Sequence, residues 1–171
     1  MKIGIIGALQ VEVEALKAKL VNPKITNISG MEFAEGTLCG KEVVVAVAGV
    51  GKVNAAMCCQ TMILSFHPDE VINTGVAGGI GQGLSVLDVV VATAVVQHDM
   101  DSSPLGDPVG MISGLDMVEM TCDADMVGRL CAAAEQVGVT PRQGLIATGD
   151  QFIASQEQIA RITAHFDAVA A

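Results

Sequence analysis

The sequence has no tryptophan or tyrosine, and only four phenylalanines are spread along its 171 residues. A surface that stacks on single-stranded nucleic acid needs aromatic side chains, so this class of partner is not expected. Basic residues are also scarce, because 9 lysines and arginines stand against 19 acids and give a formal net charge of −10. Such a chain repels nucleic-acid backbones and anionic membrane surfaces. We therefore expect no nucleic acid and no membrane among its partners.

Long uncharged runs and secretion signals are missing as well. No stretch of about 18 apolar residues lacks a charge, so the sequence predicts no membrane span. The apolar N-terminal segment reaches acids at Glu12 and Glu14 without a cleavage site, unlike a signal peptide. The five cysteines form no CxxC motif and are odd in number, which is typical of small buried thiols in a reducing compartment. We expect a cytoplasmic protein.

Apolar residues make up 51% of the chain and charged residues only 16%, a composition that excludes intrinsic disorder. No linker, repeat or low-complexity segment interrupts the sequence, and its length suits one domain over residues 1–171. Short apolar runs alternate with segments of helical spacing, which indicates an α/β layered fold with a mostly parallel sheet. We expect strands at 2–7, 31–38, 42–48, 70–75, 87–96 and 143–148, helices at 11–20, 52–66, 123–137 and 155–166, and a long loop over 100–120.

Capping residues support three of the helix boundaries. His67 is expected to end the second helix. Either Asp123 or Asp125 is a suitable N-cap for the third. Ser155 is the expected N-cap of the last, with Glu157 close behind it.

Glycine-rich turns follow several predicted strands. Glycine permits positive φ and lets a ligand approach the backbone closely. Ligands of parallel sheets bind beyond the carboxyl ends of the strands. One such glycine usually only permits a tight turn, but four turns at one sheet edge would form a concave floor of backbone NH and CO groups. These turns are Gly7-Ala8, Gly49-Val50-Gly51, Gly75 to Gly79 and Gly149-Asp150.

The turns do not match the common phosphate-binding motifs. The segment from Gly4 to Gly7 lacks the GxGxxG spacing, and Lys52 is not followed by serine or threonine as in a P-loop. No arginine precedes Arg129, although free phosphate is usually held by bidentate arginine. If this chain transfers a group, water is a better acceptor than phosphate.

Glu12 lies just beyond the first predicted strand, at the start of the first helix. A carboxylate in this position is a candidate general base for a water that attacks an electrophilic carbon. The alternative is an exposed first-turn glutamate favoured by the helix dipole, a role for which Glu14 is the better candidate. Position alone leaves both interpretations open.

Two other clusters have a chemical and a structural interpretation. His98-Asp99-Met100-Asp101 contains metal-ligand types, but no further cysteine or histidine clusters elsewhere. We therefore expect a structural network at a loop or subunit contact and no metal. Cys58 and Cys59 lie inside a predicted helix without a nearby histidine or arginine, so we predict core packing for them.

Four motifs together are far more specific than any of these features alone. They are MKIGIIGA followed by Glu12, then AGVGKVNAA, INTGVAGG and GDQFI, in this order along the whole chain. In these motifs the sequence resembles the bacterial 5′-methylthioadenosine/S-adenosylhomocysteine nucleosidases of the nucleoside phosphorylase-like superfamily. The resemblance implies a three-layer α/β sandwich with a twisted, mostly parallel central sheet, and a homodimer. It also implies hydrolysis of the N-glycosidic bond of these nucleosides with release of adenine, and no metal or organic cofactor.

The resemblance further implies roles for individual residues. Glu12 would activate the water, Phe152 would stack on adenine, and Ile153 would hydrogen-bond the base through its backbone. Val76 stands where many relatives have serine, which removes one hydroxyl near the substrate. The remaining implied positions are Ala8 and Leu9 in the pocket, Val50 and Gly51 beside the ribose and alkylthio group, Val76, Ala77 and Gly78 against the nucleoside, and the stretch from His98 to Asp101 at the dimer contact.

Relatives continue beyond a segment like the one that ends at Ala171. They carry a VEMEG-like motif whose glutamate binds the ribose hydroxyls, and an SD-containing motif whose aspartate protonates the leaving adenine. We therefore expect this chain to be part of a longer protein. Three alternatives stay open: a related hydrolase of futalosine-type nucleosides, a phosphorylase, which the scarcity of arginine disfavours, and a nucleoside-binding module without catalysis.

Overall fold

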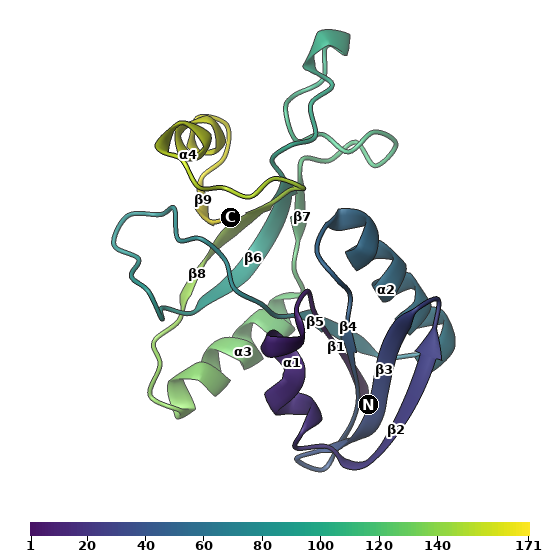
Figure 1. The fold of residues 1–171 in the computed structure, drawn as a ribbon. Helices are drawn as coiled ribbons and strands as arrows, with labels where there is room; N and C mark the ends of the chain where they lie inside the picture. Colours follow the sequence, from purple (N-terminus) through teal and green to yellow (C-terminus); the bar gives the residue numbers. More distant parts are fainter. The chain divides into compact units, whose positions relative to one another are not determined.

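The computed structural model describes residues 1–171 and contains four α-helices and two β-sheets (Figure 1). The chain divides into two compact units, residues 1–76 and residues 77–171. Each unit has its own sheet, and four of the seven strand pairings are parallel. The expected α/β fold class with mostly parallel strands is confirmed.

Unit 1 contains a five-stranded sheet with the order β2-β3-β4-β1-β5. The central strand β1 pairs in parallel with β4 and β5, while β2, β3 and β4 form an antiparallel meander. The elements of this unit are β1 (Lys2–Gly7), α1 (Gln10–Lys17), β2 (Val21–Ile28), β3 (Met31–Leu38), β4 (Lys41–Val47), α2 (Lys52–Phe66) and β5 (Glu70–Asn73).

The edge strand β2 is an element that the sequence pattern does not predict. It contains Pro23, has Asn22 at a positive φ of 54°, and shifts register between Val21 and Lys24. Proline is tolerated in a sheet at an edge or a bulge, where no ladder hydrogen bond is lost. Most of its side chains are exposed, so hydrophobic alternation gives no signal there.

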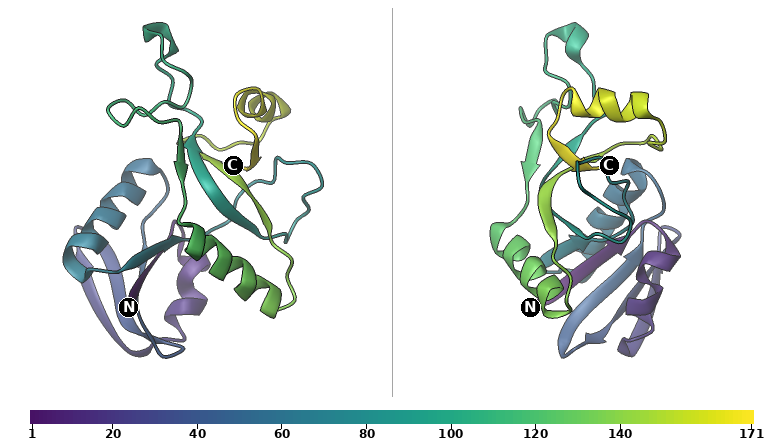
Figure 2. Two further views of the ribbon diagram at one scale, coloured as in Figure 1. Left: turned by 180° about the vertical axis from the view of Figure 1, so that it is seen from behind. Right: turned by 90° about the vertical axis from the view of Figure 1, so that its left-hand side faces the viewer.

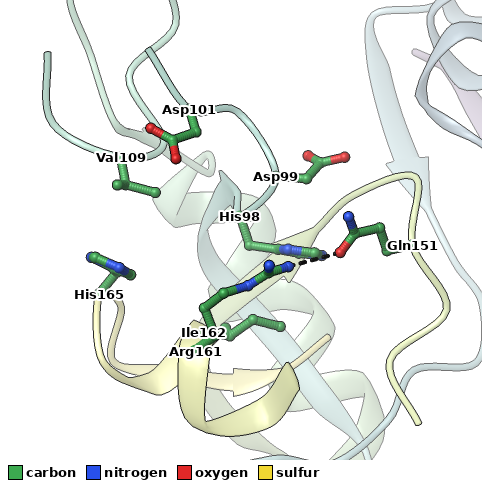
Figure 3. A pocket seen from close by; sticks show the side chains of 8 residues that line it. All are labelled: His98, Asp99, Asp101, Val109, Gln151, Arg161, Ile162 and His165. Atoms are coloured by element: carbon green, nitrogen blue, oxygen red, sulfur yellow. Dashed lines mark hydrogen bonds between the residues drawn. The ribbon is translucent and has the colours of Figure 1, made fainter. Parts of the chain in front are cut away.

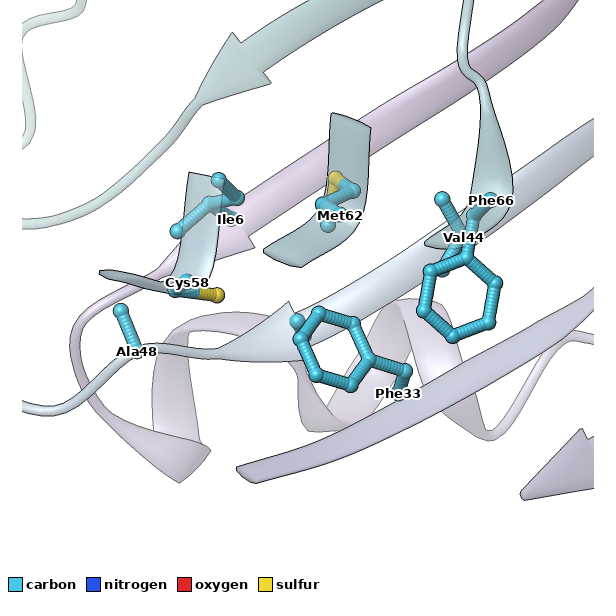
Figure 4. Close-up of a cluster of buried hydrophobic side chains, with 8 residues drawn as sticks. Ile6, Phe33, Val44, Ala48, Cys58, Met62 and Phe66 are labelled. Atoms are coloured by element: carbon cyan, nitrogen blue, oxygen red, sulfur yellow. The ribbon is translucent and has the colours of Figure 1, made fainter. Parts of the chain in front are cut away.

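One of the two hydrophobic clusters of unit 1 lies between α2 and the sheet (Figure 4), and the other includes Val13 of α1. Helical spacing places Cys58, Met62 and Phe66 on one buried face of α2. The Phe66 ring stacks on Phe33 of β3, with ring centroids 4.9 Å apart. Burial, with a smaller effect from Cys59, raises the pKa of the Cys58 thiol to about 11. The predicted packing role of Cys58 is therefore confirmed.

Unit 2 contains a four-stranded sheet with the order β7-β6-β8-β9. The strand β8 pairs in parallel with β6 and β9, and β7 is antiparallel to β6. Helix α3 packs on β6 (Figure 2). The elements of this unit are β6 (Val90–Gln97), the 3-10 helix η1 (Ser103–Leu105), β7 (Glu119–Thr121), α3 (Ala124–Gln136), β8 (Arg142–Thr148), α4 (Gln156–Thr163) and β9 (Ala168–Ala170).

The predicted long loop and helix caps are largely confirmed. Between β6 and β7 the chain holds only η1 and one isolated bridge, and it projects away from the sheet of unit 2 (Figure 2). Asp123 is the N-cap of α3, and Ser155 is the N-cap of α4. His67 ends α2 in the left-handed conformation. None of the helices has the length and apolar character that crossing a membrane requires.

Candidate functional site

Three of the expected glycine-rich turns meet at one edge of the unit 1 sheet. The strands β4, β1 and β5 are parallel neighbours, so all three end at the same edge. The N–H of Ala48 donates to the carbonyl of Gly7 at 2.8 Å. The N–H of Gly49 donates to the carbonyl of Ala8 at 3.1 Å. Within this sheet, the predicted shared edge of backbone groups is present.

The fourth turn lies on the other sheet. Gly149 and Asp150 follow β8, whose neighbours are β6 and β9. The prediction of four turns at the edge of one sheet is therefore wrong. Its cause is that sequence order and strand ends do not reveal which strands share hydrogen bonds. The expected site residues accordingly fall into two groups, one in each unit.

Glu12 is the polar centre of the group in unit 1. It lies in the first turn of α1, and its half-buried carboxylate accepts two backbone hydrogen bonds. The N–H of Leu9 donates to Oε2 at 2.8 Å, and the N–H of Val76 donates to Oε1 at 3.0 Å. Each carboxylate oxygen has a second lone pair, so the group can still accept a proton from water. The carboxylate thus joins the turn after β1 to the turn after β5, whereas Glu14 is exposed.

Two glycines make room for this carboxylate. A Cβ at Gly75 would lie 2.9 Å from Glu12 Oε1. Cβ atoms in real structures essentially never come this close to a non-bonded atom. A Cβ at Gly7 would lie 3.3 Å from the Glu12 Cβ and would also collide with Val13. Neither glycine has a positive φ, so what each provides is space, Gly75 for the Glu12 carboxylate and Gly7 for the side chains of Val13 and Glu12.

The other expected residues of unit 1 lie on the same turns. Leu9, Val50 and Val76 have exposed side chains, while Ala8 is half-buried. Gly51 is the N-cap of α2 with φ of 102°, a conformation that favours glycine. The edge beyond β4, β1 and β5 is thus lined by apolar side chains around one carboxylate.

The group in unit 2 centres on the segment 149–153, which we call the base segment. Phe152 is 91% exposed, an unusual state for an aromatic side chain, and Ile153 is half-buried. The N–H of Asp150 donates to Asp99 Oδ2 at 2.8 Å, and Gln158 Nε2 donates to the carbonyl of Phe152 at 3.2 Å. The segment has no regular secondary structure. Its backbone is instead held by the side chains of Asp99 and Gln158.

Ala77 and Gly78 lie at the start of unit 2. Ala77 is exposed. Gly78 exchanges two hydrogen bonds with Ala171, of 2.7 and 2.9 Å, which tie it to the chain just after β9. The Gly78 N–H is therefore already paired, while its carbonyl oxygen keeps a second lone pair that can accept a hydrogen bond.

Comparison with known proteins identifies the family. The profile of the Phosphorylase superfamily matches residues 2–171. A 5′-methylthioadenosine/S-adenosylhomocysteine nucleosidase from Exiguobacterium sp. (strain ATCC BAA-1283 / AT1b) is 43% identical, and the alignment covers 100% of this chain and 73% of that protein. This chain belongs to the 5′-methylthioadenosine/S-adenosylhomocysteine nucleosidase family.

Solved structures of this nucleosidase family have the same fold. The Neisseria meningitidis nucleosidase, solved in complex with methylthio-immucillin-A, superposes with a TM-score of 0.95 at 38% identity and covers 99% of this chain and 73% of that chain. The Colwellia psychrerythraea 34H nucleosidase, solved in complex with adenine, has a TM-score of 0.94 at 38% identity, with 99% and 71% covered. The fold of this chain is therefore the nucleosidase fold.

Unit 2 of this nucleosidase-family chain also contains a cavity of about 150 Å³ (Figure 3). Arg161 donates to Gln151 Oε1 at 2.9 Å across this cavity, so α4 is joined to the base segment. Hydrogen bonds from Ser103 lower the pKa of the Asp101 carboxyl, with smaller effects from His165 and Arg161. The lining residues are His98, Asp99, Asp101, Val109, Gln151, Arg161, Ile162 and His165.

Sequence reasoning found part of this network and missed the rest. The interpretation of His98 to Asp101 as a structural network at a loop is confirmed by the bond from Asp150 to Asp99. Gln158 and Arg161 were not predicted. Gln158, three residues after Ser155, has the capping-box position, and this signal identifies it better than the neighbouring Glu157.

Proposed function

We propose that this chain hydrolyses the N-glycosidic bond of 5′-methylthioadenosine and S-adenosylhomocysteine and releases adenine. The observation that carries the proposal is the Glu12 carboxylate, held by the N–H groups of Leu9 and Val76 at the edge where three parallel strands end. The membership of the nucleosidase family supplies the substrate class. The small-molecule partner is therefore a purine nucleoside.

In the proposed reaction, Glu12 is the general base. Its carboxylate takes a proton from a water molecule, while the water oxygen forms a bond to C1′ of the ribose. The bond from C1′ to N9 of adenine breaks, and its electron pair leaves with the purine, which is protonated. The family resemblance assigns this protonation to an aspartate that follows the counterpart of Ala171 in relatives. The two backbone N–H donors keep the carboxylate oriented before water arrives, so no reorganisation is needed in the transition state.

We further propose that the apolar site residues bind the nucleoside. Phe152 supplies an exposed aromatic face for adenine, and stacking of this kind contributes about 1–3 kcal/mol per base. Ile153 supplies backbone donor and acceptor groups to the base edge. The other proposed contacts are Ala8, Leu9, Val50, Gly51, Val76, Ala77 and Gly78.

Three finer features belong to the same proposal. We propose a homodimer, supported by the exposed apolar side chains of α2. We also propose a cytoplasmic location, supported by five cysteines that are all free, since a reducing compartment keeps thiols unpaired. The match of one family profile to residues 2–171 supports a single nucleosidase domain built from both units.

The variant Glu12→Gln tests whether Glu12 is the general base. The amide cannot take a proton from water, so kcat for 5′-methylthioadenosine should fall about 10²- to 10⁴-fold while adenine binding persists. The measurement is adenine release by the full-length protein, with adenine binding measured by calorimetry. Glu14→Gln is the matched control, because Glu14 lies on the same helix with an exposed side chain, and it should leave kcat unchanged. Unchanged turnover in Glu12→Gln would exclude the assigned role.

A further inference from the structure

We infer that Asp99 and Gln158 are positioning residues, which hold the base segment so that Phe152 and Ile153 receive adenine without further ordering. The inference rests on the proposed function, in which those two residues bind the base. Asp99 and Gln158 act through the backbone of the segment, one from each side of Phe152 and Ile153.

Asp99 holds the first half of the base segment. It follows the end of β6, and its carboxylate accepts the Asp150 N–H at 2.8 Å. The preceding residue, His98, donates its backbone N–H to the Thr148 carbonyl at 2.9 Å. A hydrogen bond to an ionised carboxylate is roughly twice as strong as one between neutral groups. The end of β8 and the turn that follows it are therefore joined to the chain after β6 by one backbone bond and one charge-assisted bond.

Gly149 lets these two chain segments approach so closely. A Cβ at this position would lie 2.9 Å from Asp99 Cγ and 2.5 Å from His98 Nε2. Neither atom is the free end of a long flexible side chain, so a larger residue would push the Asp99 carboxylate away from the Asp150 N–H. The glycine of the GDQFI motif is thus explained by the close contacts with His98 and Asp99.

Gln158 holds the second half of the base segment from the first turn of α4. Its Nε2 donates to the Phe152 carbonyl at 3.2 Å. Its Oε1 accepts the N–H groups of Ala154 and Ser155, each at 3.0 Å. One amide group therefore bonds the backbone on both sides of Ile153 and fixes the chain direction there. The rigid donor and acceptor geometry of glutamine suits this role.

None of these bonds uses the backbone N–H or carbonyl of Ile153, which the base would need. The bonds of Asp99 and Gln158 use the backbone groups of Asp150, Phe152, Ala154 and Ser155 and pass over Ile153. The Phe152 side chain stays 91% exposed. A segment without a strand or helix ladder would otherwise lose conformational freedom when the ligand binds, and that loss weakens affinity. Asp99 and Gln158 supply this ordering before adenine arrives.

Asp99→Ala and Gln158→Ala in the full-length protein test the inference. We expect each to raise the Kd for adenine and the KM for 5′-methylthioadenosine about tenfold, because the segment that loses these bonds must be ordered at the expense of the free energy of ligand binding. We expect kcat to change less, since neither side chain is placed at the reacting bond. Asp99→Asn keeps an acceptor oxygen and should recover most of the affinity.

Asp88→Ala is the matched control. Asp88 Oδ2 accepts the Ser85 N–H at 2.7 Å, which is the same kind of bond in another turn of unit 2. This variant should leave the Kd for adenine unchanged. If Asp99 were merely structural, Asp99→Ala would lower Tm and leave the Kd of the folded protein unchanged. The adenine Kd of Gln158→Ala is an independent test, because Gln158 bonds the other side of the base segment.

The outcomes separate this inference from the proposed function. Wild-type adenine release together with an unchanged Kd in both alanine variants would overturn the positioning roles alone. Wild-type protein that binds adenine but does not release it from substrate would overturn the proposed hydrolysis, and the adenine Kd would still decide the positioning roles. Wild-type protein that neither binds nor releases adenine would overturn both.

Discussion

A few residues other than glycine have a positive φ, a backbone conformation that their side chains disfavour. Leu87 has φ of 79° and a side chain that is 93% exposed. It is the third residue of a turn in which the Asp88 N–H donates to the Ser85 carbonyl at 3.1 Å. Turns that place positive φ at their third residue favour glycine. The Leu87 side chain therefore adds backbone strain and buries no compensating apolar surface.

Leu87→Gly should stabilise the protein by about 1 kcal/mol, because the left-handed conformation costs an L-residue roughly this much. The measurement is thermal or urea unfolding of the wild type and the variant. Val86→Gly is the matched control, since Val86 is 91% exposed in the same turn but is not among the positive-φ residues. It should not raise stability, and a larger gain from Val86→Gly would contradict the assignment of strain to Leu87.

At the same scale, the sequence predicts Glu12 well and its supporting residues poorly. Glu12 follows a strand that reads clearly as a buried run, so its place at the strand end can be predicted. That Leu9 and Val76 donate to its carboxylate depends on the pairing of β1 with β5 and on the glycines beside it. Gln158 and Arg161 lie on an amphipathic helix, where a polar residue gives no sign of which loop it contacts.

At the scale of elements, helix α2 combines a buried face with an exposed apolar face. Its buried residues repeat every four positions, and the opposite face carries Val53, Met57 and Leu64, all exposed. No charged residue occurs from Val53 to Phe66 in a chain with a net charge of −10. Two copies of such a chain repel each other over most of their surface, so an uncharged apolar face is the favoured place for self-association.

Leu64→Glu should convert the proposed dimer to a monomer, because Leu64 is 64% exposed on this face and a charge there must be desolvated on contact. The measurement is the mass in solution by analytical ultracentrifugation. Ser65→Glu adds the same charge to the next residue of the helix, which is also exposed but lies away from the apolar face. It should leave the mass unchanged. A dimer that survives Leu64→Glu would place the contact elsewhere.

The predicted elements are correct where hydrophobic periodicity and capping residues agree. An element was missed where an edge strand lacks hydrophobic alternation. The helix expected at 52–66 has these bounds in the structure, and Ser155 caps α4 as expected. The strand β2 was missed because Pro23 and the register shift beside it interrupt alternation. The three-residue strand β7 was missed inside the expected loop, since so short a segment gains its strand character only from pairing with β6.

At the scale of the whole molecule, the alternation of strands and helices predicts the α/β class but not the division of the strands into two sheets. That division depends on pairings between distant segments, such as β1 with β4 and β6 with β8. The glycine turn after β8 consequently ends a different sheet from the other three. The four motifs predict the function more specifically than the alternation of strands and helices does, because they resemble one family along the whole chain.

The most direct test of the central claim is adenine release from 5′-methylthioadenosine by the full-length protein, measured with and without inorganic phosphate. Hydrolysis predicts that adenine and methylthioribose form in phosphate-free buffer and that added phosphate does not change the rate. Formation of a ribose phosphate ester only in the presence of phosphate would instead establish a phosphorylase. Release of base from futalosine but not from 5′-methylthioadenosine would contradict the assigned substrate, and binding of adenine without any release would contradict catalysis.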